Sequence, residues 1–256
     1  MNKECPKVGC NDVDALLALR GVACLAVVIH HCNPPRNSIV YHGYDLSWII
    51  CSPGGIAVWI FFCLSGYLMG KAFYTNRYEI NLSGVVNFWR NRILRIAPLY
   101  YFAVVILALF VYTDILKIEN WGYLVRIVMF TYNHALPPAW NGAFWSLSTE
   151  FQFYLVIPFI YSYLSKYLVS KKKILFAAVS TISFVFSIKL FLWILFRYQL
   201  TESQGFGIKY WYTPLLMNMD LFLSGFFVSS FINLPHKKTS ISRAINIRIN
   251  LCLQNL

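Results

Sequence analysis

The sequence predicts an all-α protein, a polytopic transmembrane helical bundle of about six spans. Hydrophobic residues make up 58% of the chain and charged residues only 12%, whereas soluble domains carry roughly 25% charged residues. Apolar runs close to the ~20 residues that cross a bilayer as a helix recur along the chain. Basic residues cluster in short segments between these runs, a pattern typical of membrane topology signals. We therefore expect residues 1–256 to form a single membrane-embedded domain.

The six expected spans follow one another in order, and each is justified by an apolar run with few charges. The first carries Arg20, the second has no charged residue, and the fourth holds Glu150 as its only charge. The fifth contains Lys189 and the sixth contains Asp220, and we expect these two to pair structurally. The expected bounds are Ala15–Cys32, Leu46–Gly70, Ile96–Thr113, Phe144–Ser165, Ile174–Phe196 and Tyr210–Leu234.

The segments outside these spans are polar or interfacial. Residues 1–14 do not resemble a cleavable signal, so we expect the first span to be retained. Residues 117–143 are rich in aromatic side chains and are expected to form a short helix and a loop in the outer membrane interface. The tail after Leu234 is too short and too charged for a seventh span.

Basic residues in three connecting segments predict the orientation of the bundle. With six spans, the segments after spans two, four and six lie on one side, and basic loops stay in the cytoplasm. We therefore expect the N-terminus and the C-terminus to be cytoplasmic. The basic residues on the cytoplasmic side are Lys71, Arg77, Arg90, Arg92, Arg95, Lys166, Lys171, Lys172, Lys173, Lys237, Lys238, Arg243 and Arg248, against Arg36, Lys117, Arg126, Arg197 and Lys209 on the other.

The net charge and the cysteines exclude two other classes of function. The net charge of +12 resides in these short loops, which indicates topology rather than nucleic-acid binding. None of the seven cysteines forms a CxxC pair or a cysteine–histidine group with zinc-finger spacing. We expect no nucleic-acid partner and no metal site.

Arg20 and His31 stand out in the first span because a charge at the bilayer centre costs about 2.5–3.5 kcal/mol. Their spacing of eleven residues places both on one helix face, about 16 Å apart along the axis. One face thus offers a fixed cation and a titratable base. The alternative is that Arg20 snorkels toward the cytoplasm and His31 is interfacial.

Two further charged places are candidate site positions. Arg92 and Arg95, placed just before the third span, share a helix face and are suited to bind phosphates from the cytosol. A topology signal that faces lipid headgroups is the alternative. Glu150 needs a partner within an apolar span, which we expect to be Arg20, His31 or a substrate hydroxyl, and the alternative is a structural ion pair.

Four segments, taken in order, resemble the acyltransferase type 3 family of membrane proteins. The first segment has the family's pattern of an arginine and a histidine separated by ten residues. The other three resemble its FF-x-LSG-F, R-x-x-R and WSLSxE-x-QFY segments. The four segments are Leu19–His31, Val58–Tyr67, Phe88–Pro98 and Phe144–Tyr154. Family members have around ten spans, so the chain is expected to be truncated relative to the family. Phe151 also stands where many members carry a second glutamate.

The resemblance implies transfer of an acetyl or similar acyl group from a donor such as acyl-CoA to a hydroxyl of a cell-surface glycan or its precursor. In this scheme Arg92 and Arg95 bind the donor, Arg20 stabilises the oxyanion, His31 is the general base and Glu150 orients the imidazole. The expected partners are the lipid bilayer, the acyl donor and a carbohydrate acceptor, with no permanently bound cofactor. The expected location is the bacterial inner membrane.

Two other functions fit the same residues. Intramembrane arginine, histidine and glutamate side chains also suit the ion pathway of a transporter or channel component. An inactive, truncated remnant of the enzyme is the second alternative. The enzymatic hypothesis requires His31 to lie close to both Glu150 and Arg20.

Overall fold

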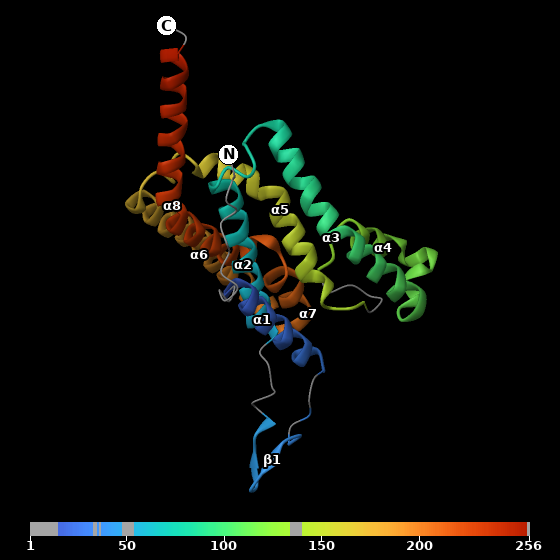
Figure 1. Cartoon of the computed structure of the whole chain (residues 1–256). Helices are drawn as coiled ribbons and strands as arrows, with labels where there is room; N and C mark the ends of the chain where they lie inside the picture. The colour runs from blue at the N-terminus through green and yellow to red at the C-terminus, as the bar shows by residue number, and fades with distance from the viewer. Residues whose placement is uncertain (1–14, 33–34, 36, 48–53, 134–139, 255–256) are drawn as a thin grey trace. The chain divides into compact units, whose positions relative to one another are not determined.

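A computed structural model describes residues 15–32, 35, 37–47, 54–133 and 140–254, with side chains placed as far as Leu234 (Figure 1). The chain divides into two compact units, Met1–Phe61 and Phe62–Leu256, and each unit is described by itself. Helices make up most of the described residues, which confirms the predicted all-α fold.

The first unit contains helix α1, Ala15–Cys32, a small β-hairpin and the first turns of helix α2, Gly54–Tyr74. Strand β1, Val40–Tyr41, pairs antiparallel with β2, Tyr44–Asp45. His42 and Gly43 connect the strands with φ of 49° and 80°, which are the positive values that a tight primed turn requires. The expected second span was therefore wrong at its start, because Leu46 follows the hairpin and α2 begins at Gly54. Residues 48–53 lie outside the described part of the chain.

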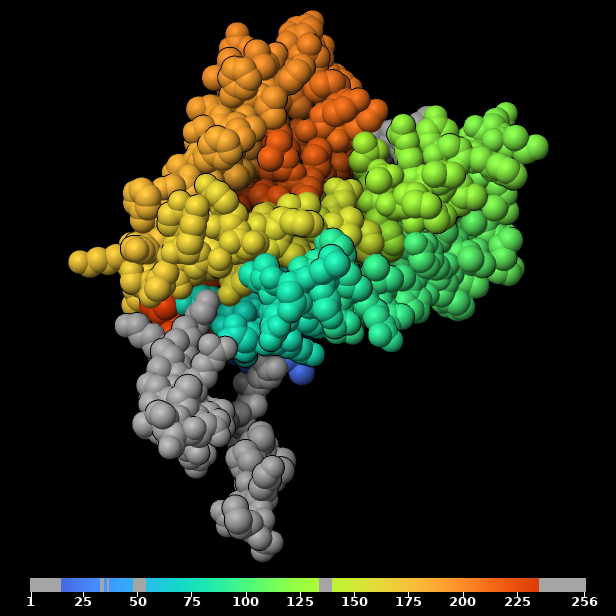
Figure 2. All heavy atoms as spheres, turned by 90° about the horizontal axis from the view of Figure 1, so that it is seen from above, coloured from blue at the N-terminus to red at the C-terminus, as the bar shows by residue number. Residues whose placement is uncertain are grey.

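The second unit continues α2 and adds the remaining helices. Aromatic stacking joins three of them, because Phe222 stacks on Phe62 of α2 at 4.5 Å and on Phe153 of α5 at 4.1 Å between ring centroids. Figure 2 shows the surface of α5 between those of α3 and α6. The elements are α3 Leu82–Phe110, η2 Thr113–Leu116, η3 Ile118–Asn120, α4 Trp121–Val128, α5 Phe144–Leu164, α6 Lys171–Glu202, α7 Gln204–Gly207, the π-helix η4 Ile208–Tyr212 and α8 Leu215–Gln254.

Each of the six expected spans coincides with a helix. Among the described residues, five helices are long and apolar enough to cross a membrane, namely α1, α2, α3, α6 and residues Leu215–Leu234 of α8. Helix α5 has 21 residues but is less apolar, because its first half contains a run of serine, threonine, glutamate and glutamine. Its buried residues point to several sides, so its polar groups face other helices rather than lipid.

Two further span boundaries differ from the prediction for identifiable reasons. Helix α3 begins at Leu82 rather than Ile96, because the Asn81 side chain accepts a hydrogen bond from the Gly84 amide at 2.7 Å and caps the helix. Arg92 and Arg95 therefore lie within α3 and not in a connection before it. The expected sixth span is interrupted at Pro214, between the end of η4 at Tyr212 and the start of α8 at Leu215, because proline has no backbone N–H to donate to the preceding turn. The short helix expected within residues 117–143 is present as α4.

Helices α2 and α8 pack with their backbones in direct contact. A side-chain carbon at Gly66 would collide with the carbonyl oxygen of Phe222, and one at Gly225 would collide with that of Cys63. At Gly70 the same carbon would lie 2.9 Å from the carbonyl oxygen of Phe226. Small residues permit this approach, as is typical of helix packing in membranes.

Lys189 and Asp220 form the expected ion pair, which joins α6 to α8. The Lys189 Nζ atom lies 2.7 Å from Asp220 Oδ2, and both side chains are partly buried. In lipid surroundings each charge requires the other, since an unpaired charge there is costly. The pair therefore fixes the register of α6 against α8.

We expect the Gly66→Ala substitution to lower the free energy of unfolding by about 1–3 kcal/mol, because the added methyl group must push α2 away from α8. Denaturation of the purified protein in detergent measures this change. Gly122→Ala in α4 is the matched control, because nothing lies within 4 Å of the added carbon. Replacing a helical glycine by alanine stabilises the folded state by roughly 0.5–1 kcal/mol where space is open. Equal stabilisation of the Gly66→Ala and Gly122→Ala variants would therefore contradict the close contact between α2 and α8.

Candidate active site around Glu150

Helix α5 brings a set of polar side chains into the bundle and satisfies several of them locally. Ser148 donates to the carbonyl oxygen of Phe144 at 3.1 Å, and Thr149 donates to that of Trp145 at 3.0 Å. The Gln152 amide donates to the carbonyl oxygen of Phe130 at 2.9 Å. These bonds leave Glu150 as the side chain of this run that needs partners from elsewhere.

Glu150 is bound by two hydroxyl groups. Ser65 of α2 and Tyr154, one turn further along α5, both donate hydrogen bonds to Glu150 Oε1. The two hydroxyls are also 3.4 Å apart, so the three side chains form a closed triangle. The partners expected for Glu150 were Arg20, His31 or a substrate hydroxyl, and within the second unit its partners are Ser65 and Tyr154.

Arg92 joins this triangle through the ring of Tyr154. The centre of its guanidinium group lies 5.7 Å from the centroid of Tyr154 and 5.6 Å from that of Phe88, both within cation–π range. The Trp89 indole N–H donates to the carbonyl oxygen of Tyr154 at 3.1 Å, which fixes α3 against α5. The buried Nε atom of Arg92 has no hydrogen-bond partner within the residues that the structure describes.

Arg95 differs from Arg92 in its surroundings. Its side chain is exposed, whereas Arg92 is half-buried against the two aromatic rings. A spacing of three residues still places both on neighbouring positions of one helix face. The structure thus brings Arg92 to the Glu150 triangle and leaves Arg95 on the surface of α3.

A polar pocket of about 500 Å³ lies at the start of α3. Tyr78 connects this pocket to Arg92. It accepts a hydrogen bond from the Asn91 amide at 3.0 Å, and its ring packs edge-to-face on Phe88 at 5.3 Å. Arginine and asparagine side chains supply many of the pocket's polar groups, including Asn76, Arg77, Asn81, Asn87 and Asn91. A continuous set of contacts therefore runs from the pocket through Phe88, Arg92 and Tyr154 to Glu150.

Arg20 and His31 belong to the other unit, on α1. Arg20 is half-buried and His31 is exposed. The ring of His30 lies 5.6 Å from that of His31, and a side chain at Gly54 would collide with the His30 ring. Arg20 and His31 share one face of α1 by helical geometry. Their approach to Glu150 stays a prediction.

Sequence reasoning missed Ser65 and Tyr154 as partners of Glu150. Ser65 precedes Gly66, which permits the close contact of α2 with α8, and the local sequence carries no signal that the Ser65 hydroxyl binds a carboxylate. The signal for Tyr154 was its spacing of four residues from Glu150, which places two side chains on one helix face. In the described ranges, no group of three histidine, cysteine, aspartate or glutamate side chains is arranged to hold a metal ion.

Comparison with known proteins adds an independent observation. The family model described as "Acyltransferase domain" matches residues 13–247. Peptidoglycan O-acetyltransferase OatA of Listeria monocytogenes is 32% identical over 162 residues, which is 57% of this chain and 24% of that protein. O-acetyltransferase OatA of Staphylococcus aureus is 26% identical over 161 residues, again 57% of this chain and 24% of that protein. The matched part thus spans about a quarter of these curated relatives. No solved structure matches the chain.

We expect Glu150→Gln and Tyr154→Phe to be energetically coupled, because the first replaces the charged acceptor of their hydrogen bond by a weaker neutral one and the second removes the donor. A double-mutant cycle on the free energy of unfolding should give an interaction term of about 0.5–3 kcal/mol. Glu150→Gln combined with Tyr163→Phe is the matched control, since Tyr163 is an exposed tyrosine of the same helix. Additive effects in the first pair would contradict the hydrogen-bonded triangle.

Proposed function

The chain belongs to the family of acyltransferase domains, and from that premise we propose that it is a membrane O-acyltransferase acting on a cell-surface glycan. It moves an acetyl or similar group from a donor such as acyl-CoA to a carbohydrate hydroxyl. The match over residues 13–247 carries the proposal. The relative from Listeria monocytogenes is named a peptidoglycan O-acetyltransferase, so a cell-wall glycan is the first acceptor to test.

In the proposed reaction the acceptor hydroxyl attacks the thioester carbonyl of the donor. His31 takes the proton of that hydroxyl as the ester C–O bond forms. Arg20 stabilises the negative charge that develops on the carbonyl oxygen. When the C–S bond breaks, the leaving thiolate receives the proton from the His31 imidazolium. The products are an O-acyl ester and the free thiol, so protons and charge balance.

Glu150 orients the His31 imidazole in this proposal, as a carboxylate does in catalytic triads. Its hydrogen bonds from Ser65 and Tyr154 support this role, because they hold the carboxylate in one orientation. Both hydroxyls donate to Oε1, which leaves Oε2 to accept a bond from an imidazole N–H. Ser65 and Tyr154 are positioning residues in this scheme.

Arg92 and Arg95 bind the phosphates of the donor in this proposal. Guanidinium groups suit this task because their planar N–H donors match phosphate oxygens. Two observations support this role. The Arg95 side chain is exposed, and the buried Nε atom of Arg92 has no hydrogen-bond partner among the residues that the structure describes. The polar pocket at the start of α3 is large enough for part of a donor. Arg77 and Glu79 line it, as does Asn91, which precedes Arg92 in the sequence.

The proposed location is the inner membrane of a bacterium with the N-terminus in the cytoplasm. The basic segments after α2 and between α5 and α6 support this orientation, since basic loops are retained inside. The start of α3 then faces the cytoplasm, where acyl-CoA is available. His31, near the end of α1, then lies toward the outer face, where the glycan is.

We expect His31→Ala to abolish transfer of labelled acetyl groups into membrane glycans while leaving membrane insertion intact, because the acceptor hydroxyl loses its base. The measurement is radiolabel incorporation in membranes that contain equal amounts of each variant. His42→Ala, at the exposed turn of the hairpin, is the matched control and should retain activity. Full activity of His31→Ala would remove His31 from the mechanism, and transport of substrate without ester formation would contradict the enzymatic function.

We expect Arg95→Gln to raise the KM for acetyl-CoA about tenfold or more, since a hydrogen bond to a charged group is worth about 1.5–3 kcal/mol. Steady-state kinetics with varied donor and fixed acceptor measure this change. Arg90→Gln provides the matched control, because Arg90 is exposed on the same helix but lies on another face. A KM that is unchanged in Arg95→Gln, or raised equally in Arg90→Gln, would contradict donor binding by Arg95.

A further inference from the structure

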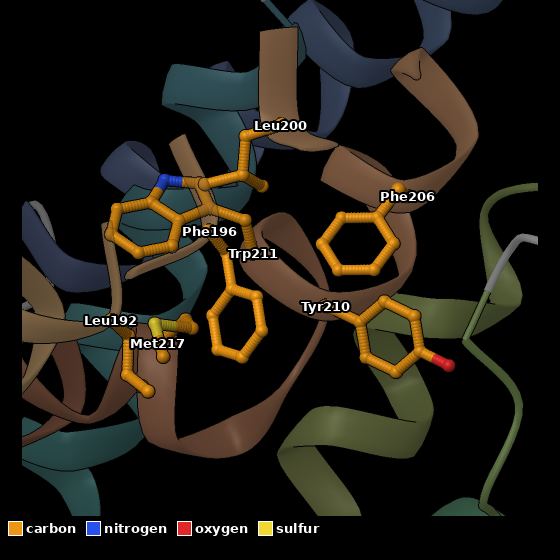
Figure 3. Close-up of a pocket in the computed structure, with 7 residues that line it drawn as sticks. All are labelled: Leu192, Phe196, Leu200, Phe206, Tyr210, Trp211 and Met217. Atoms are coloured by element: carbon orange, nitrogen blue, oxygen red, sulfur yellow. The ribbon is translucent and has the colours of Figure 1, made fainter. Parts of the chain in front are cut away.

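A second pocket, of about 380 Å³, lies where α6 ends and α8 begins (Figure 3). Four elements contribute to it, which are the last turns of α6, the short helix α7, the π-helix η4 and the start of α8. All of its lining side chains are apolar or aromatic. They are Leu192, Phe196, Leu200, Phe206, Tyr210, Trp211 and Met217.

The side chains that line this pocket are regularly spaced along α6, and tilted aromatic rings contact one another across the short helices. Leu192, Phe196 and Leu200 are four residues apart, so they follow one face of α6. Phe206 bridges to the next side chains, with its ring centroid 6.2 Å from Phe196 and 4.6 Å from Tyr210. Figure 3 shows the rings of Phe206 and Tyr210 beside each other at one side of the pocket.

Hydrogen bonds from neighbouring helices hold the turn that closes the pocket. Thr149 of α5 donates to the carbonyl oxygen of Thr213 at 2.7 Å. The Asn218 amide of α8 donates to the carbonyl oxygens of Tyr212 at 2.8 Å and Pro214 at 3.0 Å. The pocket is therefore fixed by α5 and α8 rather than by apolar collapse of α7 and η4 alone.

A cation lies at the pocket, beside one of its lining rings. The Lys209 Nζ atom is 4.9 Å from the ring centroid of Tyr210. The exposed side chains of Arg197 and Glu202 on the last turns of α6 add one positive and one negative charge. The lining residues of α6 lie more than about 30 Å along the helix from Lys172, and the hydrocarbon core of a bilayer is about 30 Å thick. Because α7 and η4 follow the end of α6, we place Lys209 at the depth of the headgroups opposite to the lysines that begin α6.

We propose that this pocket binds a hydrocarbon chain of an anionic phospholipid, whose phosphate is bound by Lys209. An apolar cavity on helices that face lipid is filled by lipid chains, and the adjacent ammonium group selects a headgroup with net negative charge. The proposal is independent of the acyl-transfer reaction, because it uses none of the residues assigned to that reaction.

Photolabelling of the purified full chain in nanodiscs of zwitterionic lipid tests this proposal. The probe is phosphatidylglycerol with a diazirine near the end of one acyl chain, and phosphatidylcholine with the same diazirine is the comparison. We expect the phosphatidylglycerol probe to label peptides within residues 192–217 at least fivefold more than the phosphatidylcholine probe. Mass spectrometry of the digested protein locates the label.

Variants separate the pocket from its cation. Leu200→Trp fills the pocket and should reduce labelling there at least fivefold. If the Leu200→Trp variant does not fold, Leu192→Phe serves as the pocket-filling variant instead. Lys209→Gln should reduce the preference for phosphatidylglycerol to less than twofold. Lys166→Gln is the matched control, because Lys166 also lies over tyrosine rings, at 4.7 Å from Tyr163 and 5.0 Å from Tyr167, and it should keep the full preference.

Three results would overturn the proposal. Equal labelling by both probes would exclude recognition of the phosphatidylglycerol charge. Unchanged labelling in correctly folded pocket-filling variants would place the lipid outside the pocket. Displacement of the probe by excess polyprenyl phosphate but not by excess unlabelled phosphatidylglycerol would assign the pocket to another lipid.

Discussion

The pairing of Glu150 is the interaction on which the second unit of this protein depends. A carboxylate among apolar helices is costly unless hydrogen-bond donors surround it. Ser65 and Tyr154 supply these donors from α2 and α5. The need for these donors constrains whole helices, because α2 must lie against α5 in the register that brings Ser65 to Glu150. The glycine contacts between α2 and α8 extend the same arrangement to a third helix.

Aromatic rings connect the Glu150 triangle to α3 and to the polar pocket at the start of α3. Tyr154 uses its hydroxyl for Glu150, its ring for Arg92 and its carbonyl oxygen for Trp89. Phe88 packs between Arg92 and Tyr78, which lines the pocket. A ligand in the pocket would therefore contact groups that are rigidly connected to the carboxylate. This connection suits an enzyme whose donor and acceptor meet at one place within the membrane.

Sequence reasoning found the helices, because long apolar runs follow from the cost of polar groups in lipid. It also singled out Arg92 and Glu150, which the structure connects through Tyr154, while the roles of the charged residues stay predictions. It placed the start of α3 too late, since a search for apolar runs does not detect a helix whose first turns are polar. It missed Tyr154 despite the spacing of four residues from Glu150. It could not find Ser65, because hydroxyl side chains are common in this chain and only packing decides which of them reach Glu150 from another helix. The meeting of His31 with Glu150 stays a prediction for the same reason, since helix spacing fixes Arg20 relative to His31 on α1 only.

The central proposal is that His31 of the first unit and Glu150 of the second act together in one catalytic centre. Cross-linking of Cys32, which is exposed beside His31, to a new cysteine on α5 tests it most directly in a chain whose other cysteines are serine. With a short bifunctional maleimide, the account predicts efficient cross-linking to Leu147→Cys, one turn before Glu150. It predicts little to Phe159→Cys, about 18 Å further along α5. Preferential cross-linking at position 159, or none at position 147, would contradict a shared site.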